Sequence, residues 1–195
     1  MDTSKRKFLT LTGAVALTSI ASPALANPIQ VSSLLTPARA KSQDRYISFF
    51  AQRTGESFQG LYRSGDQYIG ASIKEINRVL RDFRTNDVAT MDPALMDILF
   101  HLQEGVRYKG GSAPYEIISA YRSPKTNAML RRSGEGVAKN SYHTKGQAID
   151  LRVADIPTKD LAKIAKDIKV GGYSYYKQSD FLHIDTGPVR TWYGG

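Results

Sequence analysis

Two histidines and one aspartate constrain this chain more than any other feature, because they stand in short segments with a fixed spacing. His143 and Asp150 lie seven residues apart within the segment Ser141–Asp150. Gly146, between them, allows the chain to bend back so that both side chains can reach one point. His183 stands in a second apolar, strand-like run, which an antiparallel pairing would bring alongside Asp150. These three side chains predict a metal site.

The chain contains no cysteine, which excludes disulfides, iron–sulfur clusters and thiolate metal sites. Any metal must therefore be bound by histidine and carboxylate groups. Two histidines and one carboxylate leave zinc with a net positive charge and one open position, where it lowers the pKa of bound water to about 7. We therefore expect one zinc ion per chain. His101 has no such carboxylate arrangement around it and is interpreted as an ordinary histidine.

Hydrophobic periodicity and turn residues predict a single mixed domain without internal repeats. Ser72 is a candidate cap for the first helix, and Asp92-Pro93 begins the second. The pattern shows no alternation of strand and helix, so it predicts an α+β fold with a central antiparallel sheet flanked by helices. We expect strands at residues 46–50, 56–62, 115–122, 147–153, 173–176 and 181–185, and helices at 73–83, 93–105, 125–132 and 158–168.

The first 26 residues have the features of an export signal. Lys5-Arg6-Lys7 precedes an uncharged, mostly apolar run, and Ala24-Leu25-Ala26 offers small residues for cleavage. The Lys-Arg pair resembles a twin-arginine signal in which lysine replaces the first arginine. An uncleaved anchor is the alternative, but the run is short and rich in threonine and glycine. We therefore expect a signal peptide at 1–26, a poorly ordered leader at 27–43 and a folded domain at 44–195 that is exported without stable membrane insertion.

The net charge of +9 indicates a polyanionic neighbour. Cleavage after residue 26 would leave 24 basic and 17 acidic residues, a net charge of +7. The basic residues are scattered and no nucleic-acid-binding motif is present, so nucleic acid is not the expected partner. An acidic cell-wall polymer or an acidic membrane surface fits the charge.

The segment Ser141–Asp150 matches the S-x-H-x(3)-G-x-A-x-D signature of the D-Ala-D-Ala-type zinc metallopeptidases, which share the hedgehog/DD-peptidase fold. Together with Ser119–Ser123, Gly136–Lys139 and Phe181–Pro188, it makes the chain resemble the murein endopeptidase K family from about Arg45 to Trp192. The resemblance implies that residues 44–195 are the catalytic domain of a periplasmic, zinc-dependent peptidase that hydrolyses the stem-peptide cross-links of peptidoglycan. The alternative is a non-catalytic domain of the same fold that keeps its metal and binds wall peptides or a partner protein.

The resemblance also implies roles for single residues. His143, Asp150 and His183 would be the zinc ligands, and Arg122 would hold the substrate carbonyl and stabilise the developing oxyanion. Ser141 would orient the ligand loop and contribute to the substrate site. Trp192 would line the substrate groove, although packing in the core is equally compatible with its sequence context.

Two carboxylates compete for the role of general base. Asp180 stands three residues before His183, where many members of the family have Glu or Asp. Asp185 lies two residues after His183, on the same face of a strand, and could act as base or hydrogen-bond a ligand histidine. We predict Asp180 as the base and Asp185 as the supporting residue.

Overall fold

The computed structural model describes residues 43–134, 136–169 and 171–192. The predicted signal peptide and all but the last residue of the predicted leader lie outside these ranges. Within them, no helix combines the length and the apolar character needed to cross a membrane. The helices and strands are, in chain order, β1 (Arg45–Ala51), β2 (Ser57–Ser64), β3 (Gln67–Tyr68), α1 (Gly70–Val79), α2 (Pro93–Tyr108), β4 (Tyr115–Ser119), α3 (Pro124–Arg132), the 3₁₀ helix η2 (Tyr142–Lys145), β5 (Ala148–Val153), α4 (Thr158–Ile168), β6 (Gly172–Tyr176), β7 (Phe181–Asp185) and β8 (Arg190–Thr191).

The strands form one eight-stranded sheet in the order β3-β2-β1-β4-β5-β7-β6-β8. Most neighbouring pairs are antiparallel, but β1 pairs with β4 and β6 pairs with β8 in parallel. The α+β class is therefore confirmed, whereas the sheet is mixed rather than purely antiparallel. The β1–β4 pair is parallel because the long connection between them includes α1 and α2, which carry the chain back to the starting end of β1.

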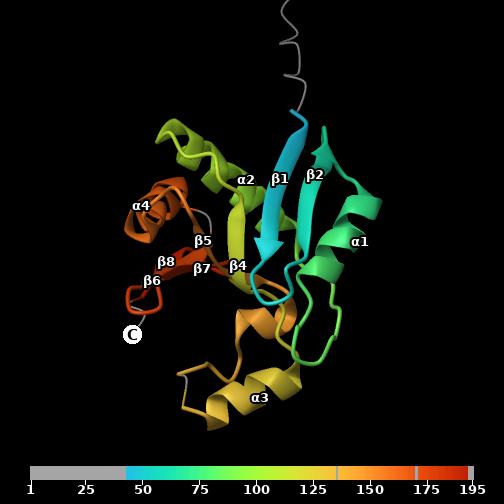
Figure 1. The fold of residues 1–195 in the computed structure, drawn as a ribbon, viewed down its shortest axis with the longest axis vertical. Helices are drawn as coiled ribbons and strands as arrows, with labels where there is room; N and C mark the ends of the chain where they lie inside the picture. Colours follow the sequence, from blue (N-terminus) through green and yellow to red (C-terminus); the bar gives the residue numbers. More distant parts are fainter. Residues whose placement is uncertain (1–42, 135, 170, 193–195) are drawn as a thin grey trace, which may run out of the picture. The chain divides into compact units, whose positions relative to one another are not determined.

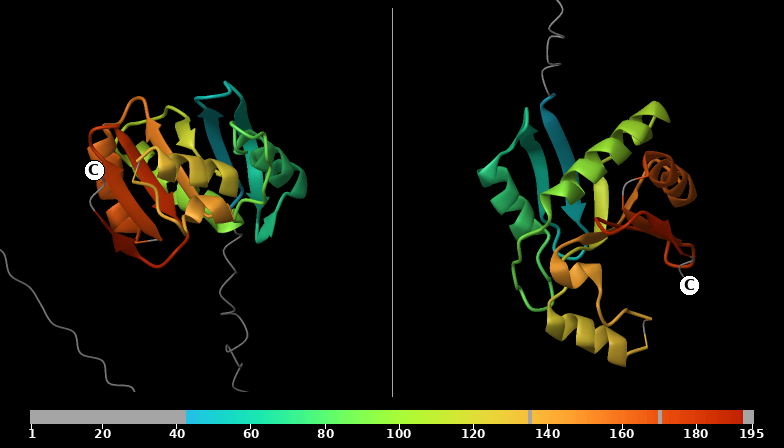
Figure 2. Two further views of the ribbon diagram at one scale, coloured as in Figure 1. Left: turned by 90° about the horizontal axis from the view of Figure 1, so that it is seen from below. Right: turned by 180° about the vertical axis from the view of Figure 1, so that it is seen from behind.

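One face of the sheet is covered by helices, which bury the apolar residues of alternate strand positions. Leu151 on β5 and Leu182 on β7 are fully buried on this face, together with Leu95 and Leu99 of α2. Figure 2 shows α2 crossing β1 and β4 in the view from behind. Strand neighbours alternate between faces, so Asp150 and His183 point to the opposite side of the sheet. The core thus determines which face carries the polar cluster.

α2 and α4 approach each other closely at one glycine. A Cβ atom on Gly105 would lie 2.2 Å from Cγ2 of Ile164 on α4. The predicted helix end at Gly105 was wrong, because α2 continues to Tyr108. Its start was correct: the Asp92 side chain accepts a hydrogen bond from the Ala94 amide, and Pro93 occupies the first turn.

The first helix differs most from its prediction. Ser72 lies inside α1 and its hydroxyl donates to the Leu61 carbonyl at 2.7 Å instead of capping the helix. The helix ends at Val79, so Phe83 is not on its buried face and is 37% exposed. The chain leaves the helical path because Asp82 accepts hydrogen bonds from the amides of Arg84 and Ser123. α3 then lies beyond the carboxyl ends of β1 and β4 (Figure 1).

Candidate metal centre

His143 is held by the short helix η2, whose two ends are defined by the sequence. Ser141 is the N-cap, and its hydroxyl oxygen accepts from the His143 amide at 3.3 Å. Gly146 ends the helix with a φ of 68°, and a Cβ there would lie 2.4 Å from the Thr90 carbonyl oxygen. Only glycine satisfies both the positive φ and this close approach. The predicted bend between His143 and Asp150 is therefore present at Gly146.

The register of β5 and β7 brings the other two residues together. Asp150 pairs directly with His183 across the two strands. His143, Asp150 and His183 are 2%, 3% and 8% exposed, so all three are removed from bulk water. His101, in contrast, lies exposed on α2.

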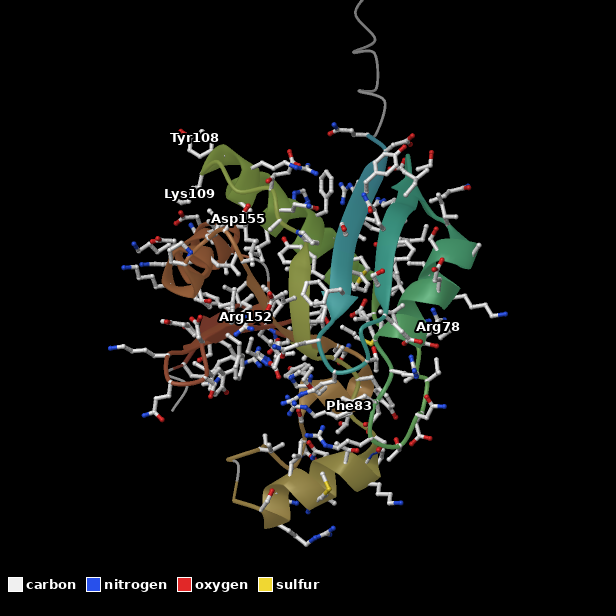
Figure 3. All side chains as sticks on the ribbon, in the orientation of Figure 1. Arg78, Phe83, Tyr108, Lys109, Arg152 and Asp155 are labelled. Carbon is white, nitrogen blue, oxygen red and sulfur yellow. The ribbon has the colours of Figure 1, made fainter. Side chains whose placement is uncertain are left out.

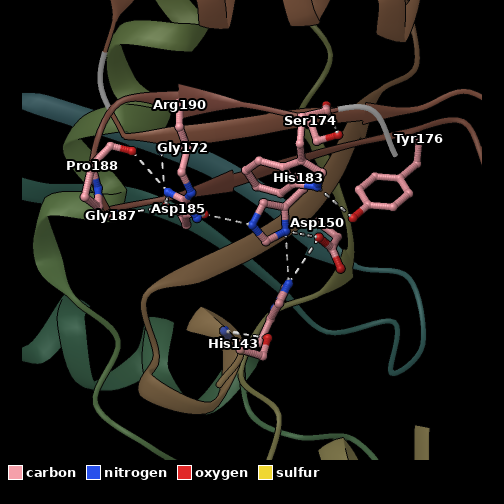
Figure 4. Close-up of polar contacts among 12 residues, drawn as sticks. His143, Asp150, Gly172, Ser174, Tyr176, His183, Asp185, Gly187, Pro188 and Arg190 are labelled. Atoms are coloured by element: carbon pink, nitrogen blue, oxygen red, sulfur yellow. Dashed lines mark hydrogen bonds and ion pairs between the residues drawn. The ribbon is translucent and has the colours of Figure 1, made fainter. Parts of the chain in front are cut away.

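The three side chains converge on one point, as Figure 4 shows. Oδ1 of Asp150 lies 2.8 Å from Nδ1 of His183 and 3.2 Å from Nε2 of His143. The two imidazole nitrogens are 3.2 Å apart. One ligand atom from each residue thus lies within 4.8 Å of the others.

Each imidazole has a hydrogen-bond partner on its outer nitrogen. Nδ1 of His143 lies 2.6 Å from the Ala120 carbonyl oxygen, which can only accept, so Nδ1 carries the proton. Nε2 of His183 lies 3.1 Å from Oδ2 of Asp185 and donates to it. In the neutral rings, Nε2 of His143 and Nδ1 of His183 are then unprotonated and face Asp150. Two nitrogen lone pairs and a carboxylate facing one another suit a divalent cation.

The electrostatics of the metal-free cluster favour this charge state at His143 and Asp150. Burial alone would lower the pKa of His183, but hydrogen bonds with Asp150 and Asp185 raise it. Burial alone would raise the pKa of Asp150, but the charges and hydrogen bonds of His143 and His183 hold it well below its usual value. Burial lowers the pKa of His143, and the nearby Arg122 charge acts in the same direction, although Asp150 opposes both. A neutral His143 and an ionised Asp150 are the forms that bind metal.

Asp185 lies directly behind His183 and is fully buried. Its Oδ1 accepts from the amides of Gly172 and Gly187 at 3.2 and 2.8 Å. Arg190 adds two parallel hydrogen bonds, at 2.9 Å to Oδ1 and 2.7 Å to Oδ2. Burial alone would raise the pKa of Asp185, but hydrogen bonds from His183 and Arg190 lower it far below its usual value. Asp185 is therefore an ionised acceptor that fixes the orientation of His183.

Arg190 is a functional candidate that the sequence did not suggest. Its guanidinium carbon lies 4.9 Å from the ring centres of both Tyr142 and Trp192. Trp192 in turn packs edge-on against His183, with ring centres 5.2 Å apart, and its Nε1 donates to the Tyr176 hydroxyl at 3.3 Å. The sequence signal for this role is weak: Asp185 and Arg190 are opposite charges five residues apart, with Gly187-Pro188 between them. Such a pattern is common on protein surfaces.

Arg122 lies on the other side of the cluster. Its Nη2 is 2.5 Å from Oδ2 of Asp150 and 3.2 Å from Nε2 of His143, while its Nε donates to the Ser119 hydroxyl at 2.9 Å. β4 ends at Ser119, so the predicted strand to Arg122 was three residues too long. The guanidinium is thus next to the atoms that would bind a metal.

Asp180 lies outside this cluster, in the exposed turn between β6 and β7, with a φ of 48°. Burial raises the pKa of Tyr175, and the charge and hydrogen bond of Asp180 raise it further. Tyr175 pairs with Leu182, so it belongs to the opposite face from His183. Among the described residues, no contact joins Asp180 to His143, Asp150 or His183. Its role as general base stays a prediction.

Comparisons with known proteins identify the family of this chain. A family model described as peptidoglycan L,D-endopeptidase MepK matches residues 39–192. The probable peptidoglycan L,D-endopeptidase MepK of Haemophilus influenzae is 40% identical over 194 residues, covering 100% of this chain and 98% of that protein. Peptidoglycan L,D-endopeptidase MepK of Escherichia coli K12 is 38% identical over 192 residues, covering 98% of each chain.

Among solved structures, the chain is similar to the L-Ala D-Glu endopeptidase ChiX of Serratia marcescens. The match has a TM-score of 0.37 and 16% identity, and it covers 49% of this chain and 80% of that one. The family model and the two full-length relatives span the sheet, the helices and the His143–Asp150–His183 cluster. This chain therefore belongs to the peptidoglycan L,D-endopeptidase MepK family.

Proposed function

We propose that this protein is a zinc-dependent endopeptidase that hydrolyses stem-peptide cross-links of peptidoglycan. One observation carries the proposal: two imidazole lone pairs and a carboxylate converge in a buried cluster whose tautomers are set by Ala120 and Asp185. The names of the relatives support the substrate class and suggest an L,D cross-link. Such a substrate lies outside the cytoplasm, which agrees with export to the periplasm through the predicted signal peptide.

The proposed metal is zinc, held by Nε2 of His143, Oδ1 of Asp150 and Nδ1 of His183. Neutral imidazoles and one carboxylate form a donor set that zinc prefers, and the absence of cysteine excludes thiolate alternatives. When bound, zinc would supply Lewis-acid polarisation of the scissile carbonyl and activation of water.

The protein's own residues would position the peptide and move protons. Arg122 is already within hydrogen-bond distance of the ligand atoms, so its guanidinium is available to donate to an oxyanion formed there. Ser141 supports His143 through the backbone of η2. Trp192 packs on His183 and supplies an apolar wall beside the cluster.

We propose Asp180 as the general base and proton donor, with Asp185 as the support of His183. The carboxylate oxygens of Asp185 contact His183, Arg190, Gly172 and Gly187, and the residue is fully buried, so it has no access to substrate. Asp180, in contrast, is exposed in the turn before β7 and is therefore accessible to a bound peptide.

The test is hydrolysis of purified cross-linked muropeptides by the protein with and without a chelator, with products identified by mass spectrometry. We expect cleavage that the chelator abolishes and that added zinc restores, with about one zinc per chain by metal analysis. Products that form equally well in the chelator would contradict the zinc mechanism. Zinc binding and muropeptide binding without any cleavage would identify the non-catalytic alternative.

A further inference from the structure

We propose that Arg152 binds a free carboxylate of the substrate peptide, within two residues of the scissile bond. The inference rests on the proposed function for the nature of the substrate, and it assigns a specificity subsite next to the metal centre. Arg152 lies on β5 (Figure 3).

Alternation along β5 puts Arg152 on the same face as Asp150. Leu151 and Val153, between and beyond them, are buried in the core on the other face. Two residues of a strand span about 7 Å, which is also the length of two residues of an extended peptide. A peptide lying along this face with its scissile bond at Asp150 would therefore bring a neighbouring residue to Arg152.

The arginine is tethered on one side only. Its Nε donates to Oε2 of Glu116 on β4 at 2.6 Å, and Glu116 and Arg152 are direct register partners. Neither Nη nitrogen of Arg152 has an acceptor among the residues that the structure describes. The side chain of Arg152 is 33% exposed and that of Glu116 is 19% exposed. The guanidinium group of Arg152 is thus held in place by Glu116, while its two Nη groups are available to bind a carboxylate in bidentate fashion.

Space for such a group is present beside the guanidinium group. A pocket of about 500 Å³ is lined by Glu116, Arg152 and Asp180, together with residues 153–158 at the end of β5 and the start of α4. Glu116 offsets the charge of Arg152, so the subsite would not bind every anion strongly. It would favour a carboxylate whose position is set by the rest of the bound peptide.

The competing explanation is structural: the Glu116–Arg152 pair would only tie β4 to β5. The two explanations differ in what happens when each partner is replaced. Glu116→Gln breaks the ion pair but keeps the cation, whereas Arg152→Gln removes the cation. A structural role predicts similar effects of both variants, and a binding role predicts an effect of Arg152→Gln alone.

The experiment measures the Kd of two synthetic stem peptides by titration calorimetry with the zinc-loaded protein. One peptide has free carboxylates and the other has carboxamides in their place. We expect the native protein to prefer the free peptide by about tenfold, the size of one charge-assisted contact. Arg152→Gln should lose this preference and bind both peptides alike, while Glu116→Gln should keep it.

Arg78→Gln is the matched control. Arg78 also pairs with a single glutamate, Glu56, at 2.6 Å, but it lies on α1, separated from β5 by β2, β1 and β4 (Figure 3). This variant should keep the native preference. The proposal is overturned if the native protein shows no preference or if Arg152→Gln retains it. Failure of the proposed function would appear differently, as absence of chelator-sensitive hydrolysis with the carboxylate preference intact.

Discussion

Asp180 and Asp185 stand at similar distances from His183 in the sequence, yet the structure gives them different surroundings. Asp185 is buried and bound by Arg190 and two backbone amides, whereas Asp180 is exposed in a turn. A carboxylate stabilised so strongly in its ionised form is a poor proton acceptor at neutral pH. Its physical effect is to fix the ring of His183.

The two aspartates can be separated by measuring zinc content together with turnover. We expect Asp180→Ala to keep about one zinc per chain and to lose roughly 100-fold in kcat, because loss of a general base leaves binding intact. Asp185→Ala should instead weaken zinc binding by about 10- to 100-fold, because His183 is no longer oriented. Full turnover in Asp180→Ala would show that the base is another group.

Arg190 touches none of the three candidate ligands directly and contacts Asp185, which orients His183, so we interpret it as a positioning residue. We predict that Arg190→Gln weakens zinc binding by about tenfold, measured by competition with a chromogenic chelator, and that Arg190→Lys restores part of it. In ¹⁵N NMR spectra of the metal-free protein, the His183 ring should change its tautomer distribution while His143 does not.

The control for Arg190 is another arginine that lies over an aromatic ring. Arg84 is 4.3 Å from the ring centre of Phe83, in the loop after α1, and it has no contact with the cluster. Arg84→Gln should leave zinc affinity unchanged. An Arg190→Gln protein with native zinc affinity and native His183 signals would show that Arg190 does not position the metal centre.

The N-terminal strands are joined to α2 through one carboxylate. Asp97 on α2 accepts from Arg45 of β1 at 2.8 Å and from Tyr62 of β2 at 2.9 Å. Arg63 of β2 and Tyr68 of β3 contact its other oxygen at 2.5 and 2.6 Å. One side chain therefore links α2 to three strands, and it also sets the orientation of the helix over the sheet.

This network predicts a pH dependence of stability. Burial alone would raise the pKa of Asp97, but hydrogen bonds from Tyr68 and Tyr62 and the charges of Arg45 and Arg63 lower it. Because the pKa is lower in the folded protein, the stabilisation is complete above the unfolded pKa and is lost as the pH falls below about 4.

We expect Asp97→Asn to lower the free energy of unfolding by about 2 kcal/mol at pH 7, measured by urea denaturation. The difference from the native protein should shrink as the pH falls below 4. Glu104→Gln, which removes only an exposed pair with Arg107, should change stability by less than about 0.5 kcal/mol. A pH-independent difference for Asp97→Asn would contradict the assignment.

The predicted elements were correct where local signals were strong. Asp92 and Pro93 define the start of α2, and Ser123 and Pro124 define that of α3. The predicted end of α1 was wrong because the Asp82 side chain accepts hydrogen bonds from the amides of Arg84 and Ser123. The contact with Ser123 joins segments that are far apart in the sequence, so no local pattern indicates it. The parallel β1–β4 pair was missed for the same reason: pairing direction depends on how the intervening helices pack, which a local pattern does not contain.

At the scale of the whole molecule, the net positive charge attracts the protein to anionic polymers. A net charge of +9 before any cleavage should concentrate it on an anionic cell wall. We predict that co-sedimentation with purified sacculi decreases several-fold between 50 mM and 500 mM NaCl, because salt screens these interactions. A neutral polysaccharide is the control and should show little binding at either salt concentration. Retention that does not depend on salt would mean that specific contacts dominate.

The sequence alone determined the elements with strong local signals, the absence of thiolate chemistry, and the histidines and aspartate proposed as ligands. These depend on residue type, on alternation and on capping, which act over a few positions. Only the tertiary structure decided that Asp150 faces His183, that Ala120 and Asp185 set the two tautomers, and that Arg190 holds Asp185. Each of these contacts depends on strand register or on the path of a turn, and both are set by the packing of the whole core.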